Sequence, residues 1–416
     1  MPTFRELGLP NQLVDALASR DVTTPFPIQA LTVPDALAGR DLLARGETGS
    51  GKTLAFGLPL LTRLAASQRP RGAASKAPRA IVLVPTRELA RQVDGVLFPL
   101  ARALRLRMRS VFGGVPIGRQ INALRQGVDV LVATPGRLTD LIKRGVCSLD
   151  EVEITVLDEA DHLCDLGFFP AVCWLLDRTP AGGQRMLFSA TLDRDVDRLV
   201  RQYLVDPVSH EIDPVPDARA AEHKFVNVTP HDKLATTADL WRSAGRTIVF
   251  VQTKHGADRL TRQLSQLGVP AVALHGNLSQ SARLRALSNF GEGGADVLVA
   301  TDVAARGIHV DNVRLVVHFD PPSEHKSYLH RSGRTARAGA SGQIVTLVLP
   351  EQRRSVARLI KLAGVDAALE PAPFGTAPDD RPARPARPGR HPRYAGSRGA
   401  AASGRRPRYR PTRAGA

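Results

Sequence analysis

The sequence G-E-T-G-S-G-K-T at Gly46–Thr53 precedes V-L-D-E-A-D-H-L-C-D-L-G-F at Val156–Phe168, and these two stretches largely decide the fold. The first fits G-x-x-x-x-G-K-[ST], a loop whose backbone N–H groups surround phosphate oxygens, with Lys52 on the β- and γ-phosphates and Thr53 on Mg²⁺. The second starts as an apolar run, Ile154–Leu157, and continues into two adjacent carboxylates. A buried parallel strand presents such a pair at its carboxyl end, one to bind metal and one to orient water. Together the stretches predict a phosphate-binding α/β domain.

Length and composition set the broad class of the protein. A chain of 416 residues is too long for one core and predicts two domains, and an apolar content of 43% is sufficient for both. No apolar run approaches the roughly 18–20 residues of a membrane span, and the N-terminus has no signal-peptide pattern. Cys147, Cys164 and Cys173 lack paired C-x-x-C spacing, so we expect neither a disulfide nor structural zinc. These features predict a cytoplasmic protein with no membrane partner.

The charge balance indicates a polyanionic partner. The formal net charge is +17 and the isoelectric point is near 10.8. A coding bias would explain the excess of arginine over lysine, but not the excess of basic over acidic residues. Two segments concentrate positive charge: Ser67–Arg79, expected to be an exposed loop, and residues 371–416, with eleven arginines and no acidic residue after Asp380. The second segment lacks the apolar residues for a core, which predicts a disordered basic tail.

Apolar runs that are typical of buried strands alternate with helical patterns along most of the chain. This alternation predicts βαβ units, and hence two tandem parallel-sheet domains with helices on both faces. The hexapeptide D-V-L-V-A-T occurs at both Asp129–Thr134 and Asp296–Thr301, as expected of equivalent strands in two similar domains. A proline-rich stretch predicts a short linker at residues 206–220, between domains at residues 1–205 and 221–370. The predicted strands are Ile81–Val84, Val130–Ala133, Ile154–Leu157, Met186–Phe188, Ile248–Val251, Val297–Ala300, Leu315–Phe319 and Ile344–Leu349.

Further short motifs follow one another in the order found in one family. Over about Phe4 to Pro350 the chain resembles the DEAD-box ATP-dependent RNA helicases, most closely the bacterial RhlE-type branch. The resemblance implies two RecA-like domains, ATP and Mg²⁺ as cofactors, and RNA as partner. The motifs that carry it are Pro25–Gln29, Gly46–Thr53, Pro85–Ala90, Gly113-Gly114, Thr134–Arg137, Asp158–Asp161, Ser189–Thr191, Val249–Thr253, Gln280 with Arg283, Thr301–Ile308 and His330–Arg337.

The resemblance assigns a nucleotide site to the first domain. It implies that Lys52 and the loop amides hold the phosphates, while Thr53 and Asp158 hold Mg²⁺. Gln29 would read the edge of adenine with its paired donor and acceptor groups. The nucleotide-binding residues so implied are Val22, Gln29, Gly46, Glu47, Thr48, Gly49, Ser50, Gly51, Lys52, Thr53, Gly307 and His309.

The resemblance also assigns residues to hydrolysis. It implies that Glu159 orients the attacking water and that Arg334 and Arg337 are arginine fingers from the second domain. Such fingers accelerate hydrolysis by roughly 10³–10⁵, so turnover should be slow until the two domains close. Alternatively, Arg331, Arg334 and Arg337 form one face of a helix that bridges to acidic neighbours.

Ser189 and Thr191 follow the predicted strand Met186–Phe188. They resemble a family motif that couples the acid pair to domain closure, which would give them a catalytic role. Serine and threonine at a strand end also serve as simple caps or turn formers.

Loops of both domains carry the RNA contacts that the resemblance implies. Hydroxyls, guanidinium groups and glycine-exposed amides address phosphates and sugars, so the predicted binding is independent of base sequence. Alternatives stay open at two positions: Gly113-Gly114 as a tight turn, and Arg87 with Glu88 as a surface ion pair. The implied RNA-binding residues are Thr86, Arg87, Gly114, Thr134, Gly136, Arg137, Arg283 and Thr301.

The chain departs from the family's pattern in two places. Val22 stands where the family has an aromatic residue that stacks on adenine, and Phe26 stands where it has Ser or Thr. We therefore expect weaker ATP binding with Phe26 packed in the domain core; the alternative is that Phe26 supplies the missing ring. His309 stands where the family has an Asp that faces the ribose. An imidazole there predicts a weak pH effect on ATP affinity, unless His309 faces solvent.

The sequence as a whole predicts an RNA-stimulated ATPase, acting as a monomer, that opens short RNA duplexes or remodels ribosomal or degradosome-type ribonucleoproteins. Two alternatives stay open. An ATP-gated RNA clamp or annealing chaperone would use the tail, because flexible arginine-rich segments bind single and double strands alike. A DNA-directed motor of the same superfamily is disfavoured by D-E-A-D, P-T-R-E-L-A and Gln29.

Overall fold

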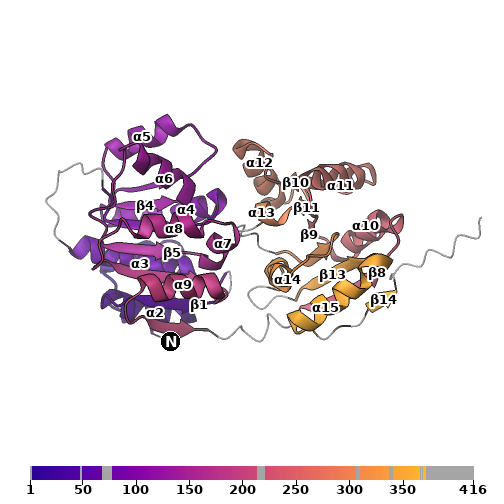
Figure 1. Ribbon diagram of the computed structural model, residues 1–416, viewed down its shortest axis with the longest axis horizontal. Coiled ribbons are helices and arrows are strands. Elements are labelled where there is room, and N and C mark those ends of the chain that lie inside the picture. The colour runs from indigo at the N-terminus through magenta and orange to yellow at the C-terminus, as the bar shows by residue number, and fades with distance from the viewer. Residues whose placement is uncertain are drawn as a thin grey trace, which may run out of the picture. The chain divides into compact units, whose positions relative to one another are not determined.

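The computed structural model describes residues 2–46, 49–67, 77–212, 221–305, 310, 312–336, 341–365, 367 and 369–371. In these ranges the chain forms two parallel β-sheets, each covered by helices on both faces (Figure 1). Both sheets belong to one compact unit. This architecture confirms the predicted fold class of two parallel-sheet α/β domains. No helix in the described ranges is both long enough and apolar enough to cross a membrane.

The first sheet is built from short runs of apolar residues. Its strands are β1 (Leu42–Arg45), β2 (Ala80–Leu83), β3 (Met108–Val111), β4 (Val130–Ala133), β5 (Ile154–Leu157), β6 (Gln184–Ser189) and β7 (Val208–Glu211). Every residue of β2, β4, β5 and β6 is buried, because helices cover both faces of the sheet. All strand pairs are parallel, in the order β3-β4-β2-β5-β6-β1-β7.

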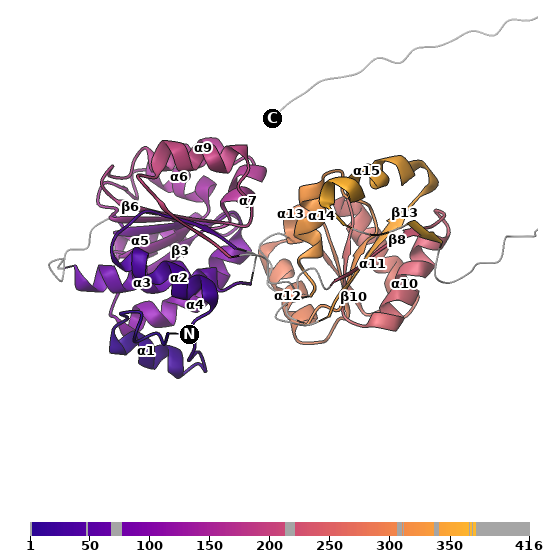
Figure 2. The ribbon, with the colours of Figure 1, turned by 90° about the horizontal axis from the view of Figure 1, so that it is seen from below.

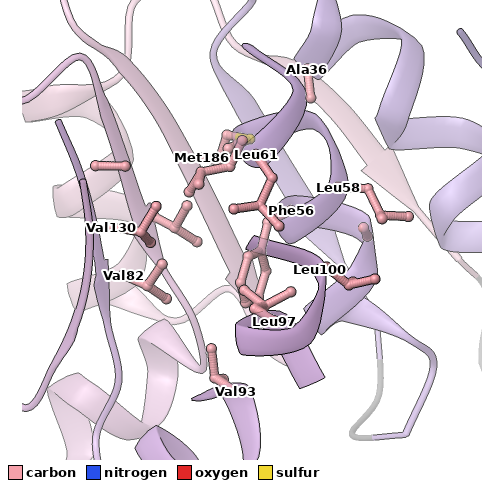
Figure 3. Close-up of a cluster of buried hydrophobic side chains, with 14 of the residues drawn as sticks. Ala36, Phe56, Leu58, Leu61, Val82, Val93, Leu97, Leu100, Val130 and Met186 are labelled. Carbon is pink, nitrogen blue, oxygen red and sulfur yellow. The ribbon is translucent and has the colours of Figure 1, made fainter. Parts of the chain in front are cut away.

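Two apolar cores, one on each face, hold the helices of the first domain against the sheet. These helices are α1 (Asn11–Ala18), α2 (Pro27–Leu37), α3 (Lys52–Ala66), α4 (Arg87–Ala103), α5 (Ile117–Arg125), α6 (Pro135–Lys143), α7 (Ala160–Asp165), α8 (Phe169–Leu176) and α9 (Arg194–Tyr203). The first core lies between the sheet and α1–α4, and the second lies between the sheet and α5–α9. Figure 3 shows Phe56 of α3 between Val82 and Val130 of the strands and Leu97 and Leu100 of α4.

The second domain repeats this design. Its strands are β8 (Glu222–Asn227), β9 (Thr247–Phe250), β10 (Ala271–Leu274), β11 (Val297–Ala300), β12 (Leu315–His318), β13 (Gln343–Val348) and β14 (Leu369–Pro371). Its helices are α10 (Asp232–Ala244), α11 (Lys254–Gln266), α12 (Gln280–Gly291), α13 (Asp302–Ala305), α14 (His325–Ser332), the 3₁₀ turn η2 (Pro350–Gln352) and α15 (Arg353–Ala363). One core packs beneath α10 and α11, and the other beneath α12–α15 (Figure 2).

The two sheets have the same topology. The second sheet has the order β10-β11-β9-β12-β13-β8-β14, which matches the first when each strand number is raised by seven. The repeated hexapeptide contains β4 and β11, which are equivalent strands, and Thr134 and Thr301 follow them. Thr86 and Thr253 immediately precede the helices that follow the equivalent strands β2 and β9, and each caps its helix through its hydroxyl oxygen. The repeat therefore reflects two structurally equivalent domains, as the sequence predicts.

The predicted linker, residues 206–220, starts too early, because its first part belongs to the first sheet. Val208–Glu211 forms β7, which pairs with β1 in parallel from Leu42↔Val208 to Arg45↔Glu211. Pro207 does not prevent this pairing, because a proline that precedes the first residue of an edge strand removes no ladder hydrogen bond. The remainder of the predicted linker, residues 213–220, lies outside the described residues, as do residues 372–416 of the predicted tail.

The predicted basic loop at residues 67–79 is also wrong at its end. Arg79 is 4% exposed, and its Nε lies 2.6 Å from Glu153 Oε1. Its Nη1 donates to the Leu64 carbonyl oxygen at 2.9 Å. A buried guanidinium needs such partners, which come from segments distant in sequence and were not apparent from local composition. Residues 68–76 lie outside the described residues.

His318, at the end of β12, should make the stability of the second domain pH-dependent. Its side chain is fully buried, and its Nδ1 lies 2.9 Å from Thr346 Oγ1. Burial, followed by the charges of Arg331 and His223, holds the pKa of His318 well below its usual 6.5. The folded domain therefore keeps the ring neutral, whereas the unfolded chain takes up a proton below about pH 6.5. We expect the free energy of unfolding to fall as the pH drops below that value, by at most about 1.4 kcal/mol per pH unit for one proton.

Urea unfolding at several pH values measures this effect. Trp241 on α10 reports on the second domain once Trp174 of the first domain is replaced by Phe. In that background, His318→Asn keeps an amide near Thr346 but removes the titrating ring, so its pH slope should be shallower. His231→Asn changes an exposed histidine of the same domain and should leave the slope as it is. Equal slopes in all three proteins would contradict the role of His318.

Candidate functional site

The carboxyl ends of the first sheet's strands bring the predicted site residues together. In a parallel sheet these ends lie at one edge, where α/β proteins bind their ligands. Along this edge, β4 and β2 lead into Thr134 and Thr86, whereas β5, β6 and β1 lead into Asp158, Thr191 and Gly46. The edge is therefore divided in two. Residues predicted to contact RNA lie in one half, and residues predicted to bind or hydrolyse the nucleotide lie in the other.

The predicted phosphate-binding loop connects β1 to α3. Gly49 and Gly51 have φ angles of 98° and 91°, which glycine adopts without strain. The Gly46 N–H donates to the Ser189 carbonyl oxygen of β6 at 3.0 Å. Lys52 is 6% exposed, begins α3, and donates from Nζ to the Gly46 carbonyl oxygen at 2.8 Å. The loop thus brings a buried ammonium group to the N-terminus of a helix, an arrangement that suits an anionic ligand.

Asp158 and Glu159 follow β5, and both are 3% exposed. Burial raises the pKa of the Asp158 carboxyl to about 7, although the positive charge of Lys52 acts in the opposite direction. The Glu159 N–H donates to Asp158 Oδ1 at 3.0 Å. The backbone of Glu159 is left-handed, with φ 51° and ψ 54°, a conformation that costs a non-glycine residue about 1–3 kcal/mol and recurs at functional sites. This turn holds both carboxylates at the edge of the sheet.

The Glu159 carboxylate is paired with His162 of α7. Nδ1 of His162 lies 2.9 Å from Glu159 Oε2, and each side chain is 4% exposed. Burial raises the pKa of Glu159, but the hydrogen bond and charge of His162, with the charges of Lys52 and Arg334, outweigh it and hold the pKa at about 2. Glu159 is therefore ionised at neutral pH and can accept hydrogen bonds from water.

Asp161 is held by the two predicted coupling residues. Its Oδ2 accepts hydrogen bonds from the N–H and Oγ1 of Thr191 at 3.0 and 3.1 Å. Its N–H donates to Ser189 Oγ at 3.2 Å, and the Ser189 hydroxyl donates to the Thr191 carbonyl oxygen at 2.7 Å. Ser189 and Thr191 are therefore more than caps of β6, because they tie that strand to the helix α7 that follows the acid pair.

The basic residues near α14 differ in position. Arg331 lies in the helix and forms a two-point ion pair with Asp302, with Nε–Oδ1 at 2.6 Å and Nη2–Oδ2 at 2.8 Å. Arg334 is 5% exposed and lies beyond the helix, which ends at Ser332. The predicted single helix face for these arginines is therefore wrong, although Arg331 does bridge to an acidic neighbour. The charge of Arg334 is one of those that hold the pKa of Glu159 low against burial.

The predicted adenine-binding segment, which contains Val22, Phe26 and Gln29, differs from its prediction. Val22 is partly buried and packs against the first core, whereas Phe26 is 57% exposed. The prediction that Phe26 packs in the core is wrong, because it precedes α2 in an extended conformation and its ring lies beside Gly51. A Cβ on Gly51 would stand only 2.7 Å from Phe26 Cδ2. Gln29 joins the two segments: its Oε1 accepts from the Phe26 N–H at 2.9 Å, and its Nε2 donates to the Gly51 carbonyl oxygen at 3.0 Å.

Two of the first-domain residues predicted to contact RNA, Arg87 and Arg137, contact the turn after β3 that contains Gly114. Gly114 has φ 76°, and a Cβ there would lie 1.8 Å from Nη1 of Arg87. Nη1 of Arg137 donates to Gln120 Oε1 at 2.8 Å, and burial lowers the pKa of Arg137. Thr86 caps α4 through its hydroxyl oxygen. The other predicted residues at this edge are Thr134 and Gly136, at the start of α6.

Arg283 of α12 forms a buried ion pair with Glu88 of α4. Arg283 Nε lies 2.8 Å from Glu88 Oε1, and the two residues are 8% and 6% exposed. Gln280 Nε2 also donates to Glu88 Oε1, at 3.2 Å, while Gln280 Oε1 accepts from Arg87 Nη1 at 3.3 Å. The alternative of an Arg87–Glu88 ion pair is therefore wrong. Of the two second-domain residues predicted to contact RNA, Arg283 therefore binds this carboxylate. The other, Thr301, follows β11 and immediately precedes α13.

Some predicted site residues lie outside the described part of the chain. They are Glu47 and Thr48 of the phosphate loop, Gly307, His309 and Arg337. The pH effect expected from His309 therefore stays a prediction.

Two features of the site were not predicted. His162 stands three residues after Glu159, a spacing that brings side chains together on a helix and was available as a signal in the sequence. The Glu88–Arg283 pair joins residues 195 positions apart, so no local pattern indicates it.

The residues predicted to hold Mg²⁺ fit that ion. Thr53 lies in the first turn of α3, next to Lys52, and the charge of Lys52 acts directly on Asp158. Hydroxyl and carboxylate oxygens are the hard ligands that Mg²⁺ prefers, and it commonly uses one or two carboxylates together with substrate phosphates. A nearby cation would also favour the ionised form of the buried Asp158 carboxyl.

The fold and the arrangement of the site define a two-domain RecA-like protein with a phosphate-binding loop in its first domain. Residues 26–199 match the DEAD/DEAH box helicase family, and residues 232–339 match the helicase conserved C-terminal domain. The chain belongs to the DEAD-box helicase family. The family predicted from the order of the motifs is thereby confirmed.

Individual relatives and a solved structure agree with this result. DEAD-box ATP-dependent RNA helicase 9 of Oryza sativa is 41% identical over 357 residues, covering 84% of this chain and 56% of the relative. DEAD-box ATP-dependent RNA helicase CshA of Bacillus cereus is 38% identical over 356 residues, with 85% and 66% covered. A structure of S. cerevisiae Dbp5 bound to RNA and ADP BeF3 matches with a TM-score of 0.77 and 30% identity, over 90% of this chain and 96% of that one. The chain spans 49–58% of the length of three curated plant relatives.

Proposed function

We propose that the protein is an ATP-dependent RNA helicase, an RNA-stimulated ATPase that opens short RNA duplexes or remodels RNA–protein complexes. One observation carries this proposal: the buried Lys52, Asp158 and Glu159 share a sheet edge with the arginines Arg87 and Arg137. A phosphate site and a basic surface at the same edge allow one ligand to influence the other. The names of the rice and Bacillus relatives, which are ATP-dependent RNA helicases, and the RNA and ADP BeF3 bound to Dbp5 support the assignment.

The residues of the nucleotide half take the following roles in this proposal. Lys52 and the loop amides bind the phosphates, and Thr53 with Asp158 would hold Mg²⁺, which neutralises charge on phosphate oxygens when bound. Glu159, ionised and fixed by its turn, accepts a hydrogen bond from the water and orients it. Arg334 stabilises the negative charge that develops on the transferred phosphoryl group. Catalysis then rests on positioning and electrostatics, as phosphoryl transfer requires.

The RNA half is proposed to bind the nucleic acid backbone. Arg87 and Arg137 address phosphates, and Gly114 exposes its backbone beside them, so no base edge is read. Within the nucleotide half, Asp161 and Thr191 tie α7 to the end of β6. ATP and RNA would each stabilise the arrangement that binds the other better, because coupling between two sites is reciprocal.

Finer assignments are proposals of the same kind. We infer a monomer that acts in the cytoplasm on ribosomal or degradosome-type ribonucleoproteins and is most like the bacterial RhlE-type branch. The Bacillus cereus relative supports a bacterial type, while the rice relative shows that plant helicases are similar too. We place the first domain at residues 1–212, because β7 belongs to its sheet, and the second at residues 221–371.

A paired assay tests the proposed function. ATP turnover is measured with single-stranded RNA, with DNA of matched sequence and without nucleic acid, alongside displacement of a short RNA duplex. Lys52→Ala serves as the control for contaminating ATPase. We expect turnover and displacement to require RNA. Turnover that RNA stimulates without displacement would favour the RNA clamp, equal stimulation by DNA would reject the RNA assignment, and no stimulation would overturn the proposal.

The predicted adenine-binding segment yields a prediction for ATP affinity. Because Phe26 is exposed beside Gly51 and Val22 packs against the core, Phe26 is the ring available to stack on adenine. Phe26→Ser should weaken ATP binding by roughly five- to a hundredfold, the range that corresponds to a lost stack of about 1–3 kcal/mol. Val22→Phe should not tighten binding, because a ring would overpack a partly buried site. Fluorescent-nucleotide titrations measure both affinities.

Phe98→Ser provides the matched control for this prediction. Phe98 is 41% exposed on α4 and lies outside the predicted adenine-binding segment, so its loss should leave ATP affinity unchanged. Tighter binding in Val22→Phe together with unchanged binding in Phe26→Ser would show that position 22 is the stacking site after all.

A further inference from the structure

His162 stands between a carboxylate of the first domain and an imidazole of the second. Its Nδ1 lies 2.9 Å from Glu159 Oε2, and its Nε2 lies 3.2 Å from Nδ1 of His330 on α14. The two imidazole rings have centroids 4.5 Å apart and are nearly perpendicular, at 88°. His162 and Glu159 are each 3% exposed, so water does not compete strongly for these contacts.

The chemistry of the three groups fixes where the hydrogens lie. An ionised carboxylate only accepts hydrogen bonds, so the hydrogen between Glu159 and His162 belongs to His162 Nδ1. The facing nitrogens of the two imidazoles can share only one hydrogen. When His162 is neutral, its Nε2 is an acceptor, and the hydrogen comes from His330 Nδ1. The hydrogen bonds then run in one direction, from His330 to His162 to Glu159.

This chain of hydrogen bonds connects elements that are remote in sequence. His162 and His330 are 168 residues apart, and His330 stands in the helix that precedes Arg334. The other contacts of Glu159 are local, since its N–H bonds to Asp158 and its backbone starts α7. Among the described residues, His162 therefore links the Glu159 carboxylate to the second domain through hydrogen bonds, whereas Arg334 acts on it through its charge.

We propose that His162 is a positioning residue that holds the Glu159 carboxylate in its working orientation, and that the bond to His330 fixes the His162 ring in the position from which it does so. The inference rests on the proposed function, because it presumes that Glu159 orients the attacking water. It gives the second domain two separate effects on hydrolysis. Arg334 supplies charge to the transition state, and His330 sets the orientation of a carboxylate of the first domain through His162.

Substitutions at His162 separate its two bonds. Asparagine places an amide N–H near the position of Nδ1 and keeps the bond to Glu159, but it is too short to reach His330. Glutamine places its amide near the position of Nε2 and keeps the contact with His330 only. Alanine removes both. A matched control is His210→Ala, which removes an imidazole 2.8 Å from Asp35 in the same domain but outside the site.

The readout is steady-state turnover of the full chain with saturating single-stranded RNA. We expect His162→Ala to lower kcat by about 10–100-fold, the usual effect of losing a residue that orients a functional group, with the KM for ATP changed less than about threefold. His162→Asn should recover kcat to about the level of His330→Ala, because both variants keep a bond to Glu159 without the link between the two histidines, and His162→Gln should not. The losses in kcat caused by His162→Ala and His330→Ala should not multiply when the two substitutions are combined. The double variant should therefore be about as slow as the slower single variant. His210→Ala should keep the wild-type kcat.

Other outcomes would overturn the proposal. A wild-type kcat in His162→Ala would do so. So would losses from the two single substitutions that multiply in the double variant, or a His162→Asn variant no faster than His162→Ala. Nitrogen NMR of the full chain with labelled histidine gives a test that needs no turnover. The His162 Nδ1 should carry its hydrogen, and the His162 Nε2 signal should shift in His330→Ala. If the wild type lacks RNA-stimulated turnover, the proposed function fails, while the NMR result still decides whether the hydrogen-bond chain exists.

Discussion

The Glu159→Gln variant is expected to lose at least about a hundredfold in RNA-stimulated ATP turnover while it retains ATP and RNA binding. The amide is nearly the same size as the carboxylate but is uncharged, so it is a far weaker acceptor for the attacking water. In the wild type the hydrogen bond from His162 and the nearby positive charges keep the carboxylate ionised despite its burial. Binding should persist because the phosphates are assigned to Lys52 and the loop, not to Glu159.

Turnover, nucleotide titration and RNA titration on the same preparation test this prediction. Glu153→Gln is the matched control, since it makes the same chemical change at a partly exposed carboxylate that pairs with Arg79. Lys52→Ala should lose turnover as well, but together with ATP affinity, because its ammonium group is assigned to the phosphates. Glu159→Gln with more than a small fraction of wild-type turnover would refute the role given to Glu159.

Arg334→Ala should lose about 10³–10⁵ in turnover, the range that arginine fingers contribute in related phosphoryl transfers. Arg334 is 5% exposed, and its charge already acts on Glu159 from beyond the end of α14. Arg334→Lys should recover little, because the planar guanidinium fork addresses two oxygens and a single ammonium does not. ATP affinity should change far less than kcat, since the charge is needed mainly in the transition state.

Arg331 provides the contrast that makes this result interpretable. Its guanidinium is bound at two points to Asp302 and also donates to the Asp320 carbonyl oxygen at 2.8 Å. Arg331→Ala should therefore lower the thermal stability of the protein, because it leaves a carboxylate without its partner. Thermal unfolding of Arg334→Ala, measured in parallel, shows how much of its loss of turnover comes from destabilisation. If both variants unfold at the same lowered temperature, the loss of turnover in Arg334→Ala would be structural.

The parallel architecture was predictable because its signals are local. Runs such as Val130–Ala133 are apolar throughout, which occurs when both faces of a strand are covered, and the repeated hexapeptide indicated two similar domains. The phosphate loop was predictable for the same reason, since its glycines, lysine and hydroxyl lie within eight consecutive positions. Local signals were also misleading at the edges. Pro207 suggested a linker where β7 joins the sheet, and the composition around Arg79 suggested exposure where a distant carboxylate permits burial.

The sequence by itself determined the strand–helix alternation, the phosphate loop, the acid pair and the order of motifs that places the chain in its family. Tertiary structure decided which partners those residues have. It placed Phe26 outside and Val22 against the core, paired Glu88 with Arg283 rather than with Arg87, and connected Glu159 to His330 through His162. The physical reason is distance along the chain. Secondary structure follows largely from neighbouring residues. The burial of a single side chain is decided by folding, and a hydrogen bond or ion pair between segments more than a hundred residues apart exists only after folding has brought them together.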